Sequence, residues 1–315
     1  MCLVLLIMEQ ARYIIGCLPG ADIVRRGEKV LDGMESVVLR SQFRQGEPKM
    51  QCRMSGVLVA AALLSAALFA VQPASAQYVP QKFPAPWTYE APTGPAQWGD
   101  LDPAYAACKA GTHQSPINLT GALPAELAPI KFDYKLTPLK IVNTGFTMQV
   151  NYEPGSSITV NGAVYDLVQF HFHHPTETAI DGQKYDLELH LVHRNAEGRL
   201  AVVSVLLKNG GENAPLRVLW NYLPKDVGKQ AEHKKVELNA EDFLPNDRNY
   251  YKYSGSLTIP PCTEGVDWYV MKKPVEVSAV QIEAFAKFFP NNARPLKPAN
   301  GRAIQESSFP KSSAE

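Results

Sequence analysis

The chain has 315 residues, with 31 basic and 31 acidic side chains, so its formal net charge is zero. A hydrophobic content of 45% and 25 prolines fit one or two folded domains with a sizeable core and exclude a disordered or collagen-like chain. Because the charge is balanced, we expect no nucleic-acid partner, and a small neutral or singly charged ligand remains open.

Residues 54–76 have the pattern of a secretory signal peptide. Arg53 precedes an apolar run that ends in Ala74-Ser75-Ala76, the small-residue pattern of a cleavage site. A membrane anchor is the alternative, but the run at 57–71 is short for a span, which needs about 20 residues. We therefore expect cleavage after residue 76, no membrane span afterwards, and a periplasmic or secreted protein.

The segment before this signal has no evident role. Since a secretory signal normally begins a protein, we interpret residues 1–53 as a non-native or misassigned extension, with translation starting at Met50 or Met54. The exported domain is then 77–315.

Cysteine use supports an oxidising compartment. Three of the five cysteines precede residue 77, which leaves Cys108 and Cys262 in the exported part. Two thiols in an exported domain favour one disulfide, and two unrelated buried thiols are the alternative.

The exported part is expected to be one β-dominated domain with its core at about 87–310. Residues 77–97 are rich in proline and aromatic residues, and we expect them to lie against the domain as an arm. Residues 200–208 form a continuous apolar run, typical of a strand buried on both faces. Helices are expected at 213–223 and after a capping box formed by Ser278 and Gln281. Alternating apolar and polar residues predict strands in LKIVN (139–143), FTMQVNY (146–152), VYDLVQFHFHH (164–174) and YDLELHLVH (185–193).

Three histidines on two of these strands predict a metal site. Because side chains alternate along a strand, His171 and His173 share one face. If the next strand pairs antiparallel, His190 approaches them closely enough for three nitrogens to reach one ion at about 2.0 to 2.1 Å. Three imidazoles without a fourth protein ligand leave a position for water, the arrangement of catalytic zinc (Zn2+).

Two further residues are placed to orient these rings. Gln169 and Glu188 each precede a candidate ligand by two residues and share its face, so each is expected to accept the second imidazole proton. By the same alternation His174 and His193 point away from the ion and are interpreted as structural.

Four ordered blocks resemble a known family: QSPINL (114–119), QFHFH (169–173), ELHLVH (188–193) and SLTIPPCTEGVDW (256–268). Together they resemble the α-class carbonic anhydrases, particularly the exported bacterial type. The resemblance implies a mostly β (α+β) single domain with a large, mainly antiparallel twisted sheet and a few small peripheral helices. It also implies reversible hydration of carbon dioxide (CO2) to bicarbonate and a proton, by attack of zinc-bound hydroxide.

The resemblance also assigns roles to individual residues. His171, His173 and His190 would hold zinc, and Thr258 would accept the hydroxide proton and pass its own proton to Glu177. Sulfonamides and anions are expected to inhibit. The implied apolar wall for carbon dioxide is Val192, Val202, Leu257 and Trp268, the implied disulfide is Cys108–Cys262, and cis bonds are implied at Ser115-Pro116 and Pro260-Pro261.

This sequence departs from the family pattern at the position of the usual proton-shuttling histidine. Phe146 stands there, and phenylalanine cannot titrate. We therefore expect an active enzyme whose turnover is limited by proton export and rescued by small buffers such as imidazole.

Two other functions remain open at this point. His171, His173 and Glu177 also match the H-x-H-x-x-x-E metal motif of the cupins, which would bind iron or manganese. A carbonic anhydrase-like binding module without catalysis is the second alternative, although the ligands, Thr258 and Glu177 are all present.

Overall fold

A computed structural model of the chain describes residues 86–310. The interpreted extension, the signal peptide and the first residues of the arm lie outside this range. Within it, no helix is long and apolar enough to cross a membrane.

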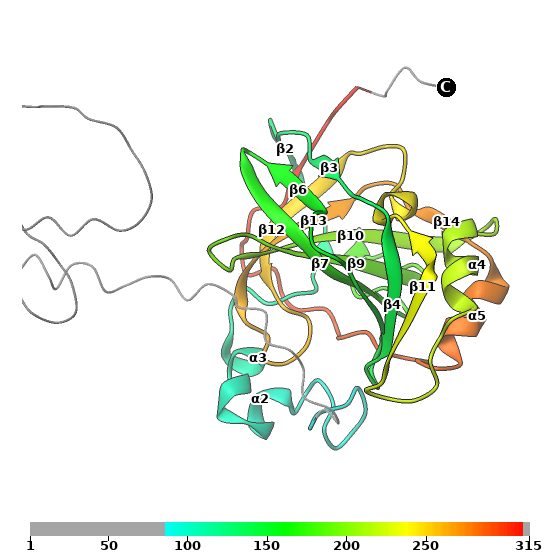
Figure 1. The fold of residues 1–315 in the computed structure, drawn as a ribbon. Coiled ribbons are helices and arrows are strands. Elements are labelled where there is room, and N and C mark those ends of the chain that lie inside the picture. The colour runs from blue at the N-terminus through cyan, green and yellow to red at the C-terminus, as the bar shows by residue number, and fades with distance from the viewer. Residues whose placement is uncertain (1–85, 311–315) are drawn as a thin grey trace, which may run out of the picture. The chain divides into compact units, whose positions relative to one another are not determined.

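One 13-stranded sheet forms the centre of the domain (Figure 1). Its strands are β2 (Leu123–Pro124), β3 (Lys131–Asp133), β4 (Thr137–Asn143), β5 (Met148–Asn151), β6 (Ser157–Val160), β7 (Ala163–His173), β9 (Leu187–Arg194), β10 (Leu200–Asn209), β11 (Gln230–Leu238), β12 (Tyr250–Ser256), β13 (Glu264–Met271), β14 (Val275–Val277) and β15 (Gln305–Glu306). A separate pair joins β1 (Asn118–Leu119) to β8 (Ala179–Ile180).

The sheet runs in the order β11-β4-β5-β7-β9-β10-β13-β12-β15-β2, with β3, β6 and β14 off this path. Most pairings are antiparallel, and the parallel ones are β10 with β13, β10 with β14, and β15 with β2. This confirms the predicted mostly β fold with a mainly antiparallel sheet. The predicted strands correspond to β4, β5, β7, β9 and β10.

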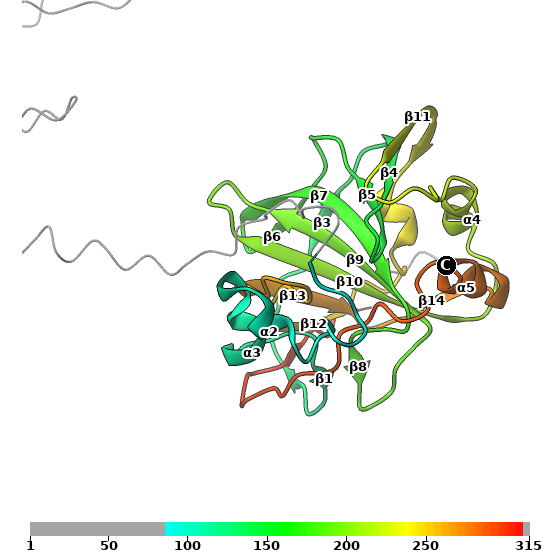
Figure 2. The same cartoon turned by 90° about the horizontal axis from the view of Figure 1, so that it is seen from below.

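The helices are short and peripheral (Figure 2). They are α2 (Trp98–Leu101), η2 (Pro103–Tyr105), α3 (Ala107–Ala110), α4 (Ala214–Trp220), η3 (Ala240–Phe243) and α5 (Ala279–Ala286). The predicted capping box begins α5, where Ser278 accepts from the amide of Gln281 and the Gln281 side chain accepts from the amide of Ser278. Asn213 caps α4 through the amide of Leu216.

The central strands are buried on both faces, as the apolar run predicted. In β10 the residues from Leu200 to Leu207 are all buried. One face carries the main core, in which Phe172 packs against Trp220 of α4 and Phe285 of α5. The opposite face is therefore left for the functional site.

The described part of the arm packs on the domain, as expected. Trp87 is buried, and its ring lies 5.1 Å from Trp98 and 4.7 Å from Phe146. The arm therefore supports the residue that stands at the predicted shuttle position.

Candidate metal centre

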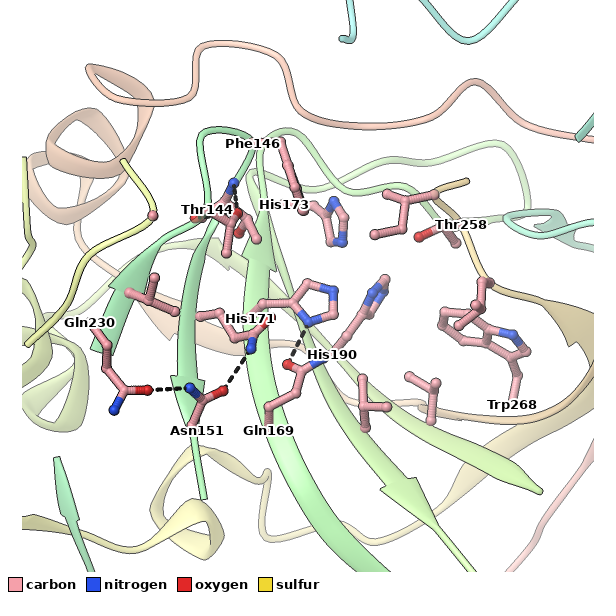
Figure 3. Close-up of a pocket in the computed structure, with 18 residues that line it drawn as sticks. Thr144, Phe146, Asn151, Gln169, His171, His173, His190, Gln230, Thr258 and Trp268 are labelled. Atoms are coloured by element: carbon pink, nitrogen blue, oxygen red, sulfur yellow. Dashed lines mark hydrogen bonds between the residues drawn. The ribbon is translucent and has the colours of Figure 1, made fainter. Parts of the chain in front are cut away.

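A cross-strand row brings the three predicted ligands together. In the antiparallel pair of β7 and β9, His171 lies directly opposite His190, and His173 shares the face of His171 (Figure 3). One nitrogen from each ring lies within 4.8 Å of the other two. This spacing permits coordination of a single ion.

A β-bulge sets this alignment. Leu167 pairs with His193, but Gln169 already pairs with Val192, so one extra residue of β7 is accommodated between them. Without that shift His171 would lie opposite Leu189, which belongs to the core on the other face. The bulge therefore puts His171 across from His190.

The second nitrogen of each ring has a hydrogen-bond partner. Nδ1 of His171 lies 2.9 Å from Oε1 of Gln169, and Nε2 of His190 lies 3.0 Å from Oε1 of Glu188, the contacts expected from sequence. Nδ1 of His173 lies 2.7 Å from the carbonyl oxygen of Asn292. These partners fix which nitrogen of each ring is left free to bind an ion. It is Nε2 in His171 and His173, and Nδ1 in His190.

The donor set fits a metal such as zinc. Burial lowers the pKa of His171 well below its usual value and also lowers that of His173, so both rings are neutral with an available lone pair. Nε2 of His173 is buried and has no hydrogen-bond partner among residues 86–310. Neutral imidazoles that converge on one point, with an unpaired buried nitrogen among them, are typical of zinc coordination.

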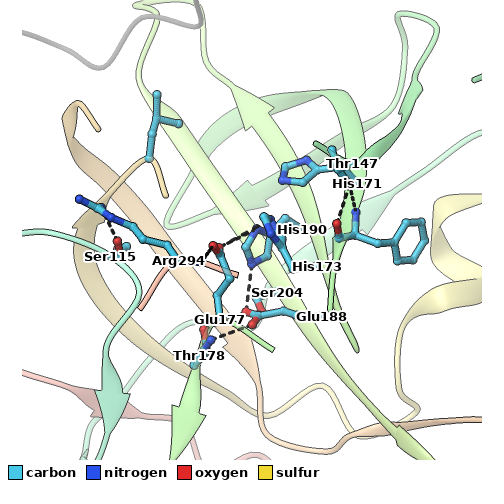
Figure 4. Close-up of polar contacts among 12 residues, drawn as sticks. Ser115, Thr147, His171, His173, Glu177, Thr178, Glu188, His190, Ser204 and Arg294 are labelled. Carbon is cyan, nitrogen blue, oxygen red and sulfur yellow. Dashed lines mark hydrogen bonds and ion pairs between the residues drawn. The ribbon is translucent and has the colours of Figure 1, made fainter. Parts of the chain in front are cut away.

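Glu177 lies beside the cluster and is fully buried (Figure 4). Its Oε1 accepts a hydrogen bond of 2.8 Å from the Arg294 amide, and its Oε2 lies 3.6 Å from Nε2 of His173. Burial raises the pKa of Glu177 to about 7, against the opposing effects of His190, the Arg294 amide and the Thr258 side chain. Oε2 of Glu177 is buried without a hydrogen-bond partner among residues 86–310, so the contact with Thr258 that the resemblance implied stays a prediction.

A cavity of about 300 Å³ opens above the three rings. One wall is apolar and follows a second cross-strand row, in which Val192 pairs with Val202 and Val202 with Trp268. Leu257 completes the implied apolar wall. All four residues implied by the resemblance thus line the same cavity as the histidines.

The opposite wall is polar, which the sequence analysis did not predict. Nε2 of Gln149 donates to Oδ1 of Asn151, and Nδ2 of Asn151 donates to Oε1 of Gln230, each at 2.6 Å (Figure 3). Gln149 and Asn151 pair across β5 and β7 with His171 and Gln169. The alternation of β5 could have revealed them once this pairing was known.

Phe146 also lines the cavity, and it is held firmly. Its ring rests on Trp87, and its carbonyl oxygen accepts a hydrogen bond of 2.8 Å from Nδ2 of Asn292. Phenylalanine at this position cannot carry protons, so the position provides no proton shuttle. This is why proton export is expected to limit turnover.

The loop that carries Thr258 is tied to the rest of the domain. Cys108 of α3 and Cys262 form the predicted disulfide. The amide of Leu257 donates to the carbonyl of Thr263, which closes the loop at its base. The expected cis bonds at Ser115-Pro116 and Pro260-Pro261 are present, with two further cis bonds at Ala91-Pro92 and His174-Pro175.

The two neighbouring histidines lie outside the cluster. His193 is fully buried in the core with Nε2 2.8 Å from the Tyr134 hydroxyl, and Nδ1 of His174 lies 2.9 Å from the carbonyl of Pro290. Neither residue belongs to the group of side chains that could hold an ion.

Comparison with known proteins decides the family. Residues 93–308 match the model of the eukaryotic-type carbonic anhydrases. The chain belongs to this family. It is 42% identical over 225 residues to a carbonic anhydrase of Nostoc sp., an alignment that covers 70% of this chain and 85% of the relative.

Solved carbonic anhydrase structures share the fold. A hyperthermostable carbonic anhydrase from an active hydrothermal vent chimney matches with a TM-score of 0.68 and 44% identity, covering 70% of this chain and 100% of that one. The α-carbonic anhydrase of Thermovibrio ammonificans, in complex with the inhibitor sulfanilamide, matches with a TM-score of 0.68 and 41% identity, covering 70% and 98%.

These findings do not favour the cupin alternative. Cupins are jelly rolls built from two packed sheets, whereas this domain has one 13-stranded sheet. The cluster that could hold an ion contains His190 rather than Glu177 as its third member.

Proposed function

We propose that this carbonic anhydrase-family chain is a zinc enzyme that reversibly hydrates carbon dioxide to bicarbonate and a proton. The observation that carries the proposal is the convergence of three imidazoles at the base of a cavity with one apolar wall. Nε2 of His171, Nε2 of His173 and Nδ1 of His190 would hold the ion. Bound zinc supplies a nucleophile near neutral pH by lowering the pKa of coordinated water, for which carbonic anhydrase is the reference example.

Thr258 and Glu177 orient the nucleophile in this proposal. The Arg294 amide holds one oxygen of the Glu177 carboxylate, which leaves the other free to accept the hydroxyl proton of Thr258. With its own proton engaged, the Thr258 oxygen serves as an acceptor toward the metal site. A fixed acceptor of this kind selects one orientation of the attacking group and lowers the entropic cost of reaction.

The apolar and polar walls of the cavity have different roles in this proposal. Val192, Val202 and Trp268 offer no hydrogen bonds to water, so a nonpolar gas rests there without displacing strongly bound solvent. The side-chain amides of Gln149 and Asn151 line the opposite wall, where they would offer polar contacts to water and to a leaving bicarbonate product.

We also propose that the protein is exported and works in the periplasm or outside the cell. The signal-like segment at 54–76 supports this, and so does the Cys108–Cys262 disulfide, since such bonds persist mainly in oxidising compartments.

A hydration assay tests the function. Stopped-flow measurement with the purified protein is expected to show carbon dioxide hydration, inhibition by sulfanilamide and one zinc ion per chain by elemental analysis. Bound zinc without hydration would instead identify a binding module, and bound iron in place of zinc would contradict the proposed zinc enzyme.

Replacing Phe146 with histidine is expected to raise turnover several-fold in dilute buffer. The imidazole would stand at the cavity, where it can carry protons between the metal site and solvent. The measurement is turnover as a function of imidazole concentration. At high imidazole, Phe146→His and the unmodified protein should reach the same turnover.

Phe146→Ala is the matched control, because it opens the same space without a titratable group. It should give no gain in dilute buffer. Equal turnover of Phe146→His and the unmodified protein at every buffer concentration would show that another proton route already suffices.

A further inference from the structure

The Glu188 carboxylate collects more hydrogen bonds than one histidine partner requires. Its Oε1 lies 3.0 Å from Nε2 of His190, 2.8 Å from Oγ1 of Thr178 and 2.6 Å from Oγ of Ser204, while Oε2 accepts from the Thr178 amide at 2.8 Å. Glu188, Thr178 and Ser204 are fully buried (Figure 4). The carboxylate is therefore held entirely by protein groups.

Ser204 is out of place in its strand unless it serves this contact. It is the one polar residue among the buried positions Leu200–Leu207 of β10. A buried hydroxyl is costly unless it is hydrogen-bonded. Within residues 86–310, the bond to Glu188 is the only one that the Ser204 hydroxyl makes.

Strand register gives Ser204 this position. It lies directly opposite His190 in the antiparallel pair of β9 and β10, so it extends the row that begins with His171. From there its hydroxyl reaches the same carboxylate oxygen that faces Nε2 of His190.

We propose that Ser204 is a positioning residue for zinc retention, acting through Glu188. The hydroxyl fixes Oε1 where it accepts the Nε2 proton of His190, so Nδ1 stays directed at the other two rings. This inference rests on the proposed zinc site. Without the hydroxyl, only the two Thr178 bonds hold the carboxylate, so Oε1 is fixed less firmly beside His190 and the ligand is oriented less tightly.

Ser204 is a better probe of this function than Thr178. An alanine at 178 would keep the backbone amide bond to Oε2, whereas Ser204→Ala removes its whole contact with the carboxylate. The substitution also deletes the donor itself, so it leaves no unpaired hydroxyl in the core.

The test is the rate of zinc release into a chromogenic chelator, measured on the intact zinc-loaded protein. Loss of a residue that directly partners a ligand lowers metal affinity about 10- to 100-fold, carbonic anhydrases being among the cases that define this range. Ser204 contacts the ligand only through Glu188, so the effect of Ser204→Ala should be smaller. We expect it to raise the rate of zinc release about threefold to tenfold.

Ser156→Ala is the matched control. Ser156 is also buried, and its hydroxyl accepts a single bond from the Lys135 amide, so unlike Ser204 it has no contact with Glu188. This variant should lose similar stability in urea unfolding and release zinc at the unmodified rate.

A double-mutant cycle separates positioning from general loosening. Glu188→Gln is itself expected to speed zinc release, because it removes the direct partner of His190, and in that background Ser204→Ala should add little. Unchanged release by Ser204→Ala alone, or full additivity with Glu188→Gln, would overturn the inference while leaving the zinc function intact. Absence of zinc from the unmodified protein would overturn both.

Discussion

Replacing His173 with alanine is expected to lower zinc affinity by more than about 100-fold and to abolish carbon dioxide hydration at ordinary zinc concentrations. Even a residue that only partners a ligand costs about 10- to 100-fold when removed, a range that includes carbonic anhydrases, and a lost ligand costs more. Nε2 of His173 is buried beside the other two rings and has no hydrogen-bond partner in residues 86–310. Competition with a chelator of known affinity measures the effect.

The adjacent residue supplies the control. His174→Ala removes a histidine one position along the chain, whose Nδ1 bonds the Pro290 carbonyl outside the cluster. This variant should keep its zinc and its turnover. Equal zinc loss in both variants would mean that the effect is a local unfolding of the segment rather than loss of a ligand.

Replacing Thr258 with alanine is expected to reduce hydration turnover by about 100-fold while zinc stays bound. A small error in the orientation of reacting groups costs on the order of 100-fold in rate. Thr258 lines the cavity and is the proposed partner of Glu177, but it is not among the side chains that could hold the ion. Stopped-flow rates and zinc content on the same sample separate the two effects.

Thr258→Ser is the matched control, because it keeps the hydroxyl and removes only a methyl group. It should recover most of the turnover. If Thr258→Ala instead lost zinc in proportion to activity, or if serine failed to restore the rate, the orienting role of the hydroxyl would be refuted.

Periodicity alone predicted which face the three clustered histidines and Gln169 occupy. The alternation in 164–174 and 185–193 placed His171, His173 and His190 on shared faces and Gln169 beside its ring. Such patterns are local, so they can be recognised in the sequence without knowledge of the tertiary structure.

Register could not be predicted in the same way. The bulge near Val168 decides whether His171 meets His190 or Leu189, and no turn residue or glycine in β7 marks it. Asn292 was missed for a related reason: it reaches His173 across 119 positions of sequence, and it contributes a backbone carbonyl that no residue type signals.

Of the fifteen strands in residues 86–310, ten were not predicted, and three of these, β11, β12 and β13, are seven residues or longer. β11 is an edge strand that pairs only with β4 and has no fully buried residue, so its polar sequence lacks the apolar alternation of an inner strand. β12 ends at the first residue of the SLTIPPCTEGVDW block and β13 begins within it, and the sequence analysis used this block only for the family resemblance.

Because the metal site depends on the bulged pairing of β7 with β9, it is complete only when these two strands pair in the native register. A displacement of β9 by two residues would keep the correct face but present Glu188 or Val192 opposite His171 instead of His190. Misregistered chains would retain their strands and much of their apolar burial, yet they would lack a complete set of imidazoles. Spectroscopic measurement of β content would not separate the native state from compact chains in which β7 and β9 pair in the wrong register. Bound metal ion would separate them, because only the native register brings the three imidazoles together.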